Sequence, residues 1–101
     1  MTRYEVTFTD SADADFDSIL HYIAKDNPFR AISFVDELRQ RSIDFLSTAP
    51  NAGTRAGRHR YFVFARYVVV YLVDDDSLQV RVLLVTEGHR DWRAILDDLA
   101  Q

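Results

Sequence analysis

The chain has 101 residues, 48% of them hydrophobic, a net charge of −4 and no cysteine. This length suits one compact core, the composition excludes a disordered chain, and the lack of cysteine excludes disulfides, thiolate catalysis and cysteine-ligated metals. The sequence contains neither the run of roughly 20 apolar residues that a membrane helix requires nor the apolar stretch of a signal peptide, so we expect a single domain, residues 1–101, in the cytoplasm and without a membrane partner.

The first half of the chain predicts one strand and two helices. Residues 3–9 alternate between apolar and polar side chains, which indicates a strand. A helix is predicted from an N-cap at Asp10-Ser11 to about Lys25, with one apolar stripe made of Ala12, Phe16, Ile19, Leu20 and Ile23. Residue 27 is pushed out of helical geometry because Pro28 follows it, and Pro28 suits the start of a second helix that runs to about Ser47.

The second half predicts a sheet. A turn as short as the one before Pro28 makes the two helices an antiparallel hairpin, and their one-sided stripes require a sheet to pack on. Residues 48–57 predict a loop, and β-rich runs follow at 61–64, 67–73 and 78–86. The run 67–73 is apolar on both faces, as in a central strand.

Two connections and the chain end complete the predicted fold. Ala65-Arg66 is a poor hairpin turn, because neither residue favours positive φ, whereas residues 74–77 are typical turn residues. A short C-terminal helix is indicated by Trp92, Ile95, Leu96 and Leu99. The predicted class is α+β, with an antiparallel sheet packed against an α-helical hairpin in the order β-α-α-β-β-β.

Charge is distributed unevenly along the chain. Residues 1–44 and 74–101 each carry a net charge of −4, whereas residues 45–73 contain no acid and four arginines: Arg55, Arg58, Arg60 and Arg66. This middle block is either an ordinary solvated loop and strand edge or a surface for an anionic partner, such as an acidic peptide or a nucleic-acid backbone. The acidic chain as a whole argues against tight nonspecific binding of nucleic acid.

This order of elements resembles the ParE/RelE superfamily of bacterial toxins. Residues 21–28, His-Tyr-Ile-Ala-Lys-Asp-Asn-Pro, resemble the interhelical turn of ParE-type proteins, and Leu46, Pro50 and Gly53 resemble the family's loop after the second helix. Residues 67–71 resemble its tyrosine-rich third strand. Residues 85–92, Val-Thr-Glu-Gly-His-Arg-Asp-Trp, resemble the ParE strand-end signature. The resemblance covers about residues 3–92.

The resemblance implies a RelE/ParE-like fold and the toxin of a type II toxin–antitoxin, or plasmid stabilisation, module. A cognate antitoxin would hold such a toxin inactive by wrapping it with a C-terminal segment. ParE-type members are associated with inhibition of DNA gyrase, and RelE-type members with ribosome-dependent cleavage of mRNA. An interaction module that has lost toxicity is the third interpretation.

The residues themselves favour binding over RNA cleavage. Cleavage requires a base, an acid and cations for the phosphate, which RelE-like proteins supply through sheet lysines and arginines and a C-terminal tyrosine or histidine. Here the only lysine is Lys25, and no tyrosine follows Tyr71. We therefore predict no catalytic residue; if the chain were a nuclease, the candidates would be Arg81, His89 and Arg60. The three histidines lack metal-ligand spacing, so no metal or cofactor is predicted.

Two binding surfaces are predicted. We expect the target, DNA gyrase, to contact His89, Arg90, Asp91 and Trp92. We expect the antitoxin to contact a set rich in arginines and aromatics, which dominate interface energies: Arg58, Arg60, Tyr61, Phe62, Phe64 and Arg66. An acidic amphipathic segment would suit that surface. Direct sequence-specific binding of nucleic acid is not expected, and a higher-order toxin–antitoxin oligomer is compatible with these surfaces.

Three further residues have specific expectations. His21 lies on the polar face of the first helix and is expected to be a solvated surface residue. His59, between two arginines, is expected at the surface or in contact with the antitoxin. Arg81 either lies on the open face of the sheet or serves as a cation at its concave face.

Overall fold

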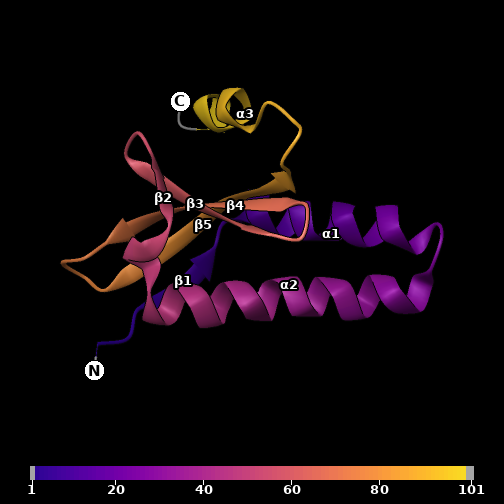
Figure 1. Cartoon of the computed structure of the whole chain (residues 1–101), viewed down its shortest axis with the longest axis horizontal. Coiled ribbons are helices and arrows are strands. Elements are labelled where there is room, and N and C mark those ends of the chain that lie inside the picture. The colour runs from indigo at the N-terminus through magenta and orange to yellow at the C-terminus, as the bar shows by residue number, and fades with distance from the viewer. Residues whose placement is uncertain (1, 100–101) are drawn as a thin grey trace.

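A computed structural model describes residues 2–99 of the chain, and Figure 1 shows the arrangement of its elements. In chain order these are β1 (Glu5–Phe8), α1 (Asp10–Ala24), α2 (Pro28–Thr48), the 3₁₀ helix η1 (Pro50–Ala52), β2 (Thr54–Ala56), β3 (His59–Phe64), β4 (Tyr67–Asp74), β5 (Gln79–Glu87) and α3 (Trp92–Leu99). The α+β class, the helical hairpin and the short C-terminal helix are confirmed. No helix within residues 2–99 has the length and apolar character that crossing a membrane requires.

The strands form one sheet in the order β1-β5-β4-β3-β2. Strands β2 to β5 pair antiparallel, and β4 is central, as its two apolar faces predict. The prediction of an entirely antiparallel sheet is corrected by β1, which runs parallel to β5 with Glu5 opposite Gln79 and Phe8 opposite Val82. The long connection through α1 and α2 permits this, because parallel neighbours require a crossover rather than a tight turn.

Side-chain caps fix the ends of both long helices. The N-cap of α1 is Thr9, whose Oγ1 accepts a 3.1 Å hydrogen bond from the backbone N–H of Ala12. The predicted cap at Asp10-Ser11 is therefore displaced by one residue. Asn27 caps α2 by accepting a 3.0 Å bond from the N–H of Arg30, and Pro28 occupies the first helical position, where its missing N–H costs nothing.

The predicted loop at 48–57 is more ordered than the sequence indicates. It contains η1 and the short strand β2, in which Thr54 pairs with Tyr61 and Ala56 with His59. Gly57 makes the return turn possible, because its φ of 63° is one that glycine adopts readily. The Ala65-Arg66 turn does join β3 to β4, with Ala65 held at a φ of 56°.

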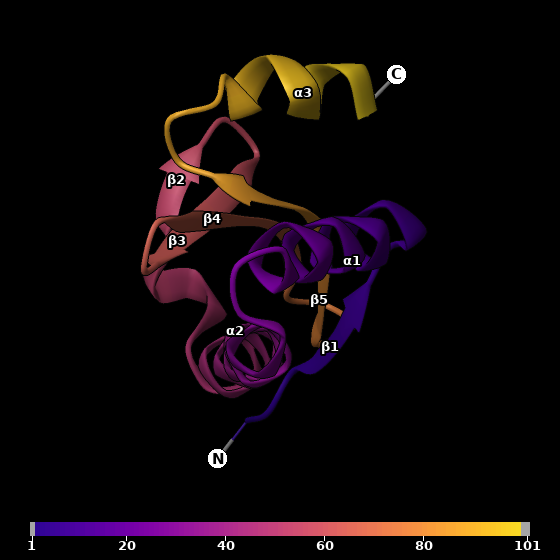
Figure 2. The same ribbon diagram turned by 90° about the vertical axis from the view of Figure 1, so that its right-hand side faces the viewer.

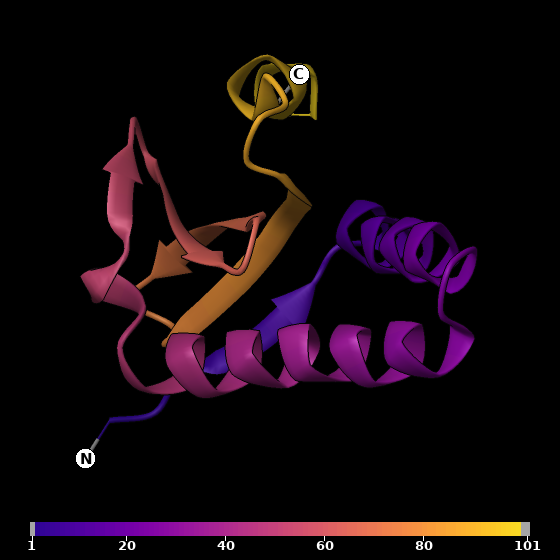
Figure 3. The same ribbon diagram turned by 45° about the vertical axis from the view of Figure 1, so that its right-hand side comes forward.

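The helical hairpin and α3 lie on opposite faces of the sheet (Figures 2 and 3), and each face buries a separate core. The helical hairpin covers one face, where its stripes pack on a cluster that includes Phe16, Leu38, Val69, Tyr71 and Val82. The opposite face is partly covered by α3, whose Trp92 and Leu96 pack on Val68, Val70 and Leu84. Helix α3 covers only part of this face of the sheet. On the uncovered part, Thr7, Leu72 and Arg81 line an open hollow.

Candidate functional site

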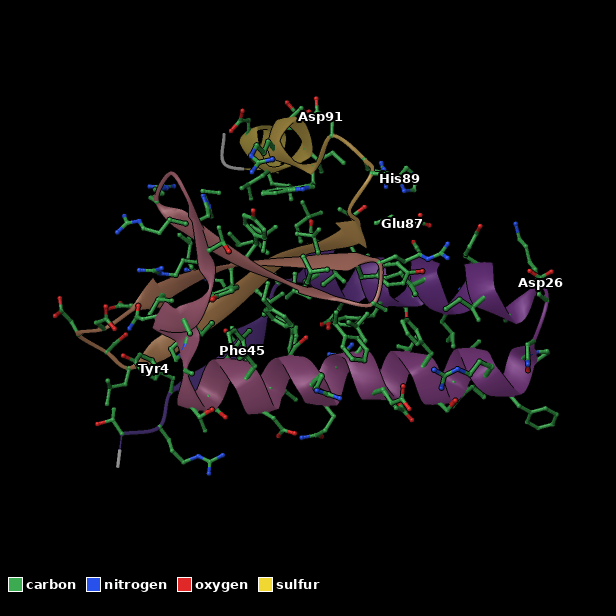
Figure 4. The ribbon with its side chains drawn as sticks, in the orientation of Figure 1. Tyr4, Asp26, Phe45, Glu87, His89 and Asp91 are labelled. Carbon is green, nitrogen blue, oxygen red and sulfur yellow. The ribbon has the colours of Figure 1, made fainter. Side chains whose placement is uncertain are left out.

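The polar segment after β5 forms a rim between the sheet and α3 (Figure 4). Glu87 Oε2 and His89 Nδ1 lie 3.0 Å apart, and Arg90 Nη1 donates a 3.4 Å hydrogen bond to Thr86 Oγ1. His89, Arg90 and Asp91 are exposed, whereas Trp92 is only 5% exposed. Three of the four predicted target contacts are therefore accessible, and the fourth is the anchor of α3: its ring lies 4.9 Å from that of Tyr61.

Beside this rim lies a cleft of about 280 Å³ between α1 and the end of β5. Asp15 lines it from α1, and its Oδ2 accepts a 2.9 Å hydrogen bond from the backbone N–H of Val85. Burial raises the pKa of the Asp15 carboxyl, while the bond from Val85 and the charge of Arg90 oppose that rise. Sequence reasoning does not single out Asp15; the signal that it borders the core is its position directly before the buried Phe16.

The three residues named for a nuclease do not gather. Arg60 pairs with Tyr71, and its Nη1 donates a 2.9 Å hydrogen bond to the carbonyl of Gly53. Arg81 pairs with Leu72, and its side chain lies on the opposite face of the sheet from that of Arg60. It is exposed there, in agreement with the prediction that it lies on the open face. His89 lies beyond the other end of β5, and the six residue steps from Arg81 to Glu87 alone span roughly 20 Å.

Three of the four arginines in the acid-free block do converge. Arg55, Arg58 and Arg60 line a hollow of about 140 Å³, which we call the arginine cradle and whose other lining residues are Asn51, Val73 and Asp75. Nitrogen-tipped side chains gather beside β2 in Figure 4. Arg66 lies apart, at the turn between β3 and β4, where it lines a different hollow with Tyr22 and Tyr67. Guanidinium groups bind carboxylates and phosphates through charge-assisted hydrogen bonds, so the cradle has the chemistry to receive an anionic group.

The aromatic residues predicted to contact an antitoxin are half-buried and contribute to the two cores. Phe62 packs on Phe45 with ring centroids 4.8 Å apart, and Phe64 stacks on Phe34 at 6.0 Å. Tyr61 faces the other way and packs on Trp92. Each ring therefore has a structural role and offers only part of its surface to a partner.

The prediction of a surface position for His59 is wrong. His59 is 8% exposed and lies under α3, beside a cavity of about 540 Å³ that Arg58, Arg93 and Asp97 also line. Burial lowers its pKa, the charge of Arg58 lowers it further, and Asp97 opposes the shift. Its strand position explains the burial, because His59 shares a face with Tyr61 and that face lies against α3. His21 is exposed as predicted, and its Nδ1 lies 2.7 Å from the carbonyl oxygen of Asp17.

The described residues hold no gathered metal ligands. Within residues 2–99, no group of three or more His, Asp or Glu side chains is arranged to hold an ion.

Comparison with known sequences identifies the family. The sequence model described as "ParE toxin of type II toxin-antitoxin system, parDE" matches residues 6–92. The chain belongs to the ParE toxin family. It is thus a toxin of the ParE/RelE type II toxin–antitoxin class, as its resemblance to that superfamily implies. No curated protein sequence matches this ParE-family chain.

Solved structures of toxins share the fold of this ParE-family chain. A chain from the chromosomal ParDE toxin–antitoxin system of P. aeruginosa superposes with a TM-score of 0.70 at 19% identity, over 83% of this chain and 95% of that one. A chain of the RelBE2 toxin–antitoxin complex from Mycobacterium tuberculosis has a TM-score of 0.67 at 21% identity, over 89% and 97%. A chain of the E. coli RelBE complex has a TM-score of 0.60 at 18% identity, over 86% and 99%. Similarity at this level shows the fold, which ParE and RelE toxins have in common.

Proposed function

We propose that this ParE-family toxin acts in the cytoplasm by binding DNA gyrase and inhibiting it, without turning over a substrate, and that a cognate antitoxin neutralises it. The observation that carries the proposal is the dispersal of the three residues that the sequence offers for RNA cleavage. Arg60 is held by the Gly53 carbonyl on one face of the sheet, Arg81 lies on the other face, and His89 lies beyond the far end of β5. A phosphodiester cannot contact all three together.

The rim is the proposed gyrase contact. His89, Arg90 and Asp91 are exposed on a short connection between two well-packed elements, β5 and α3, so a partner meets them in a defined arrangement. Trp92 acts indirectly by fixing the start of α3. A preorganised surface of this kind loses little conformational freedom on binding.

The proposed antitoxin surface is the arginine-rich block with its aromatic flank. Its arginines carry four positive charges without an acid in residues 45–73, while the complete chain is negative. An acidic antitoxin segment is attracted to this block specifically, whereas a polyanion is repelled by most of the molecule. Higher-order assembly of toxin with antitoxin is a further part of the proposal.

A supercoiling assay tests the gyrase proposal. Purified gyrase and relaxed plasmid are incubated with an excess of wild-type toxin. A parallel reaction contains the His89→Ala/Arg90→Ala variant, in which the proposed contact is altered. We expect the wild-type protein to block supercoiling and the variant to be weaker. Supercoiling that proceeds normally at excess toxin contradicts the proposal.

One observation favours RNA cleavage as the second candidate. The buried His59 lies beside a cavity with Arg58 and Arg93, and its lowered pKa keeps the imidazole neutral near pH 7, as a general base requires. A ribosome-dependent nuclease of RelE type would cleave message in a reconstituted translation reaction, and His59→Gln or His89→Ala would abolish that cleavage. Intact message at excess toxin eliminates this candidate. Harmless overexpression without any antitoxin would instead favour a non-toxic interaction module.

A further inference from the structure

The arginine cradle places like charges directly opposite each other. Arg55 on β2 pairs in register with Arg60 on β3, and like charges at such positions destabilise a sheet. Within residues 2–99, Arg55 and Arg58 make no ion pair. The guanidinium groups therefore repel one another, and no carboxylate within the described residues neutralises all of their charge.

The one carboxylate in the cradle is already engaged. Asp75 Oδ1 accepts a 2.6 Å hydrogen bond from Tyr4 Oη and a 3.1 Å bond from Asn51 Nδ2. Both bonds lower the pKa of Asp75, and the bond from Tyr4 has the larger effect. The Asp75 carboxyl is therefore ionised. Three guanidinium groups and one carboxylate leave the cradle with a net charge of two positive units. An external anion would relieve the repulsion that remains.

One arginine of the cradle is held in place before anything binds. Arg60 Nη1 is fixed by the Gly53 carbonyl at 2.9 Å, and the loop that carries this carbonyl is fixed by Tyr71 Oη, which donates a 2.7 Å bond to the carbonyl of Pro50. Tyr71 is completely buried. Arg60 therefore loses little conformational entropy when the cradle captures an anion.

We propose that the arginine cradle receives one carboxylate side chain of an acidic polypeptide, namely the antitoxin segment that inhibits this toxin. This inference rests on the proposed function and adds Arg55, Asn51 and Asp75 to the antitoxin surface. A hollow of about 140 Å³ suits one carboxylate. A nucleic-acid strand fits less well, because it carries a phosphate at every nucleotide, and the phosphates on either side of the cradle would meet Asp74, Asp75 and Asp76 of the adjoining turn. A polypeptide can present a single carboxylate there.

Fluorescence anisotropy with the full-length toxin tests this directly. The probes are a labelled peptide with glutamate at every fourth position, the same peptide with glutamine in place of glutamate, and a labelled single-stranded oligouridylate. The variants are Arg55→Gln and Arg58→Gln. Lys25→Gln is the matched control, since it removes the same charge at the tip of the helical hairpin, away from the cradle.

The expected result has four parts. Affinity for the glutamate peptide falls about tenfold in Arg55→Gln and in Arg58→Gln, remains at the wild-type value in Lys25→Gln, and is absent for the glutamine peptide. The melting temperature of Arg55→Gln equals or exceeds that of wild type, because its repulsion with Arg60 is removed. Weaker binding by a variant that is at least as stable separates a binding role from a structural one.

Three results would overturn the inference. These are unchanged peptide affinity in both arginine variants, an equal loss in Lys25→Gln, and tighter arginine-dependent binding of the oligouridylate than of the peptide. The gyrase proposal is judged separately by supercoiling. Normal supercoiling together with cradle-dependent peptide binding would contradict the gyrase proposal and support the cradle.

Discussion

Asp15 on α1 accepts a hydrogen bond from the backbone N–H of Val85 on β5, 70 positions later in the chain, at 2.9 Å. Strand β1 pairs with β5 only as far as Val82, so the edge of β5 beyond that point lacks a neighbouring strand. The carboxylate of Asp15 replaces the missing strand at Val85. One side chain thus joins the helical hairpin to the end of the sheet that leads into the rim.

Replacing Asp15 by alanine should destabilise the fold. The variant leaves the Val85 N–H in the cleft without its acceptor, which we expect to lower the free energy of unfolding by about 1–2 kcal/mol. Urea denaturation near neutral pH measures the change. Asp15→Asn keeps an amide oxygen at the same position and should lose less; equal losses in the two variants would show that the acceptor is unimportant.

The raised pKa of Asp15 gives a second, pH-dependent prediction. Because burial raises the pKa in the folded state, the folded protein holds this proton more tightly than the unfolded chain does. The stabilisation that comes from this tighter proton binding is therefore complete below the pKa of Asp15 in the unfolded chain, and it is lost as the pH rises through the pKa in the folded protein. Asp15→Asn should remove this contribution from urea midpoints measured across the acidic range. A pH profile unchanged by the substitution contradicts the shift.

His59 should make the protein less stable in mild acid. The pKa of His59 in the folded state is lowered from the ordinary value of 6.5. Its contribution to stability is therefore complete above pH 6.5 and is lost as the pH falls through the folded pKa. Urea midpoints from about pH 7.5 to pH 5 should therefore decrease in the wild type and decrease less in His59→Gln. His21→Gln, at an exposed histidine, is the control and should follow the wild type. A decline retained in full by His59→Gln would assign the effect to other groups.

Gly53 should tolerate no side chain. A Cβ at this position would lie 1.9 Å from Tyr71 Oη, so Gly53→Ala must displace the hydroxyl that binds Pro50, at an expected cost of about 2–3 kcal/mol. Tyr71→Phe alone should cost about 1–2 kcal/mol. The double variant should cost less than the two single costs together, because both disturb one contact. Denaturant titration of the wild type, the two single variants and the double variant measures this coupling. Full additivity of the two costs would argue against a shared contact.

Gly57→Ala serves as the control for Gly53→Ala. No atom lies within 4 Å of a Cβ at Gly57, but its φ of 63° disfavours alanine, so we expect a cost of about 1 kcal/mol from the backbone alone. This cost should be unaffected by Tyr71→Phe. Coupling between positions 57 and 71 would mean that the effect at Gly53 is not a local clash.

Trp92 should hold α3 without supporting the main core. Its cluster lies on the opposite side of the sheet from the helical hairpin. Trp92→Ala should therefore expose the amides of α3 to hydrogen exchange while those of β4 remain protected. Leu99→Ala, at an exposed position on the same helix, should change stability by less than about 0.5 kcal/mol. Loss of protection in β4 as well would show that α3 is part of one cooperative unit.

The elements that the sequence predicts well are those with local signals. The proline at position 28 and the apolar stripe around Phe16 specify the helical hairpin, and the doubly apolar run 67–73 specifies the central strand. The arginines of the cradle also stand out in the sequence as part of a charged block. Each of these signals depends on residues within a few positions of one another.

The features that the sequence does not predict depend on distant contacts. The parallel pairing of β1 depends on β5, more than 70 positions away, and the role of Asp15 depends on where β1 stops. Strand β2 is three residues long and has no alternating pattern. His59 looked exposed because its sequence neighbours are arginines, yet strand geometry turns it towards α3.

The most direct test of gyrase inhibition titrates the toxin against a fixed amount of gyrase and follows plasmid supercoiling. A reconstituted translation reaction, run in parallel, is probed for cut message. An inhibitor that binds without turnover should block supercoiling only as its concentration approaches that of gyrase, and it should leave the message intact. Normal supercoiling at excess toxin, or message cut by toxin present far below the concentration of ribosomes, would contradict the account.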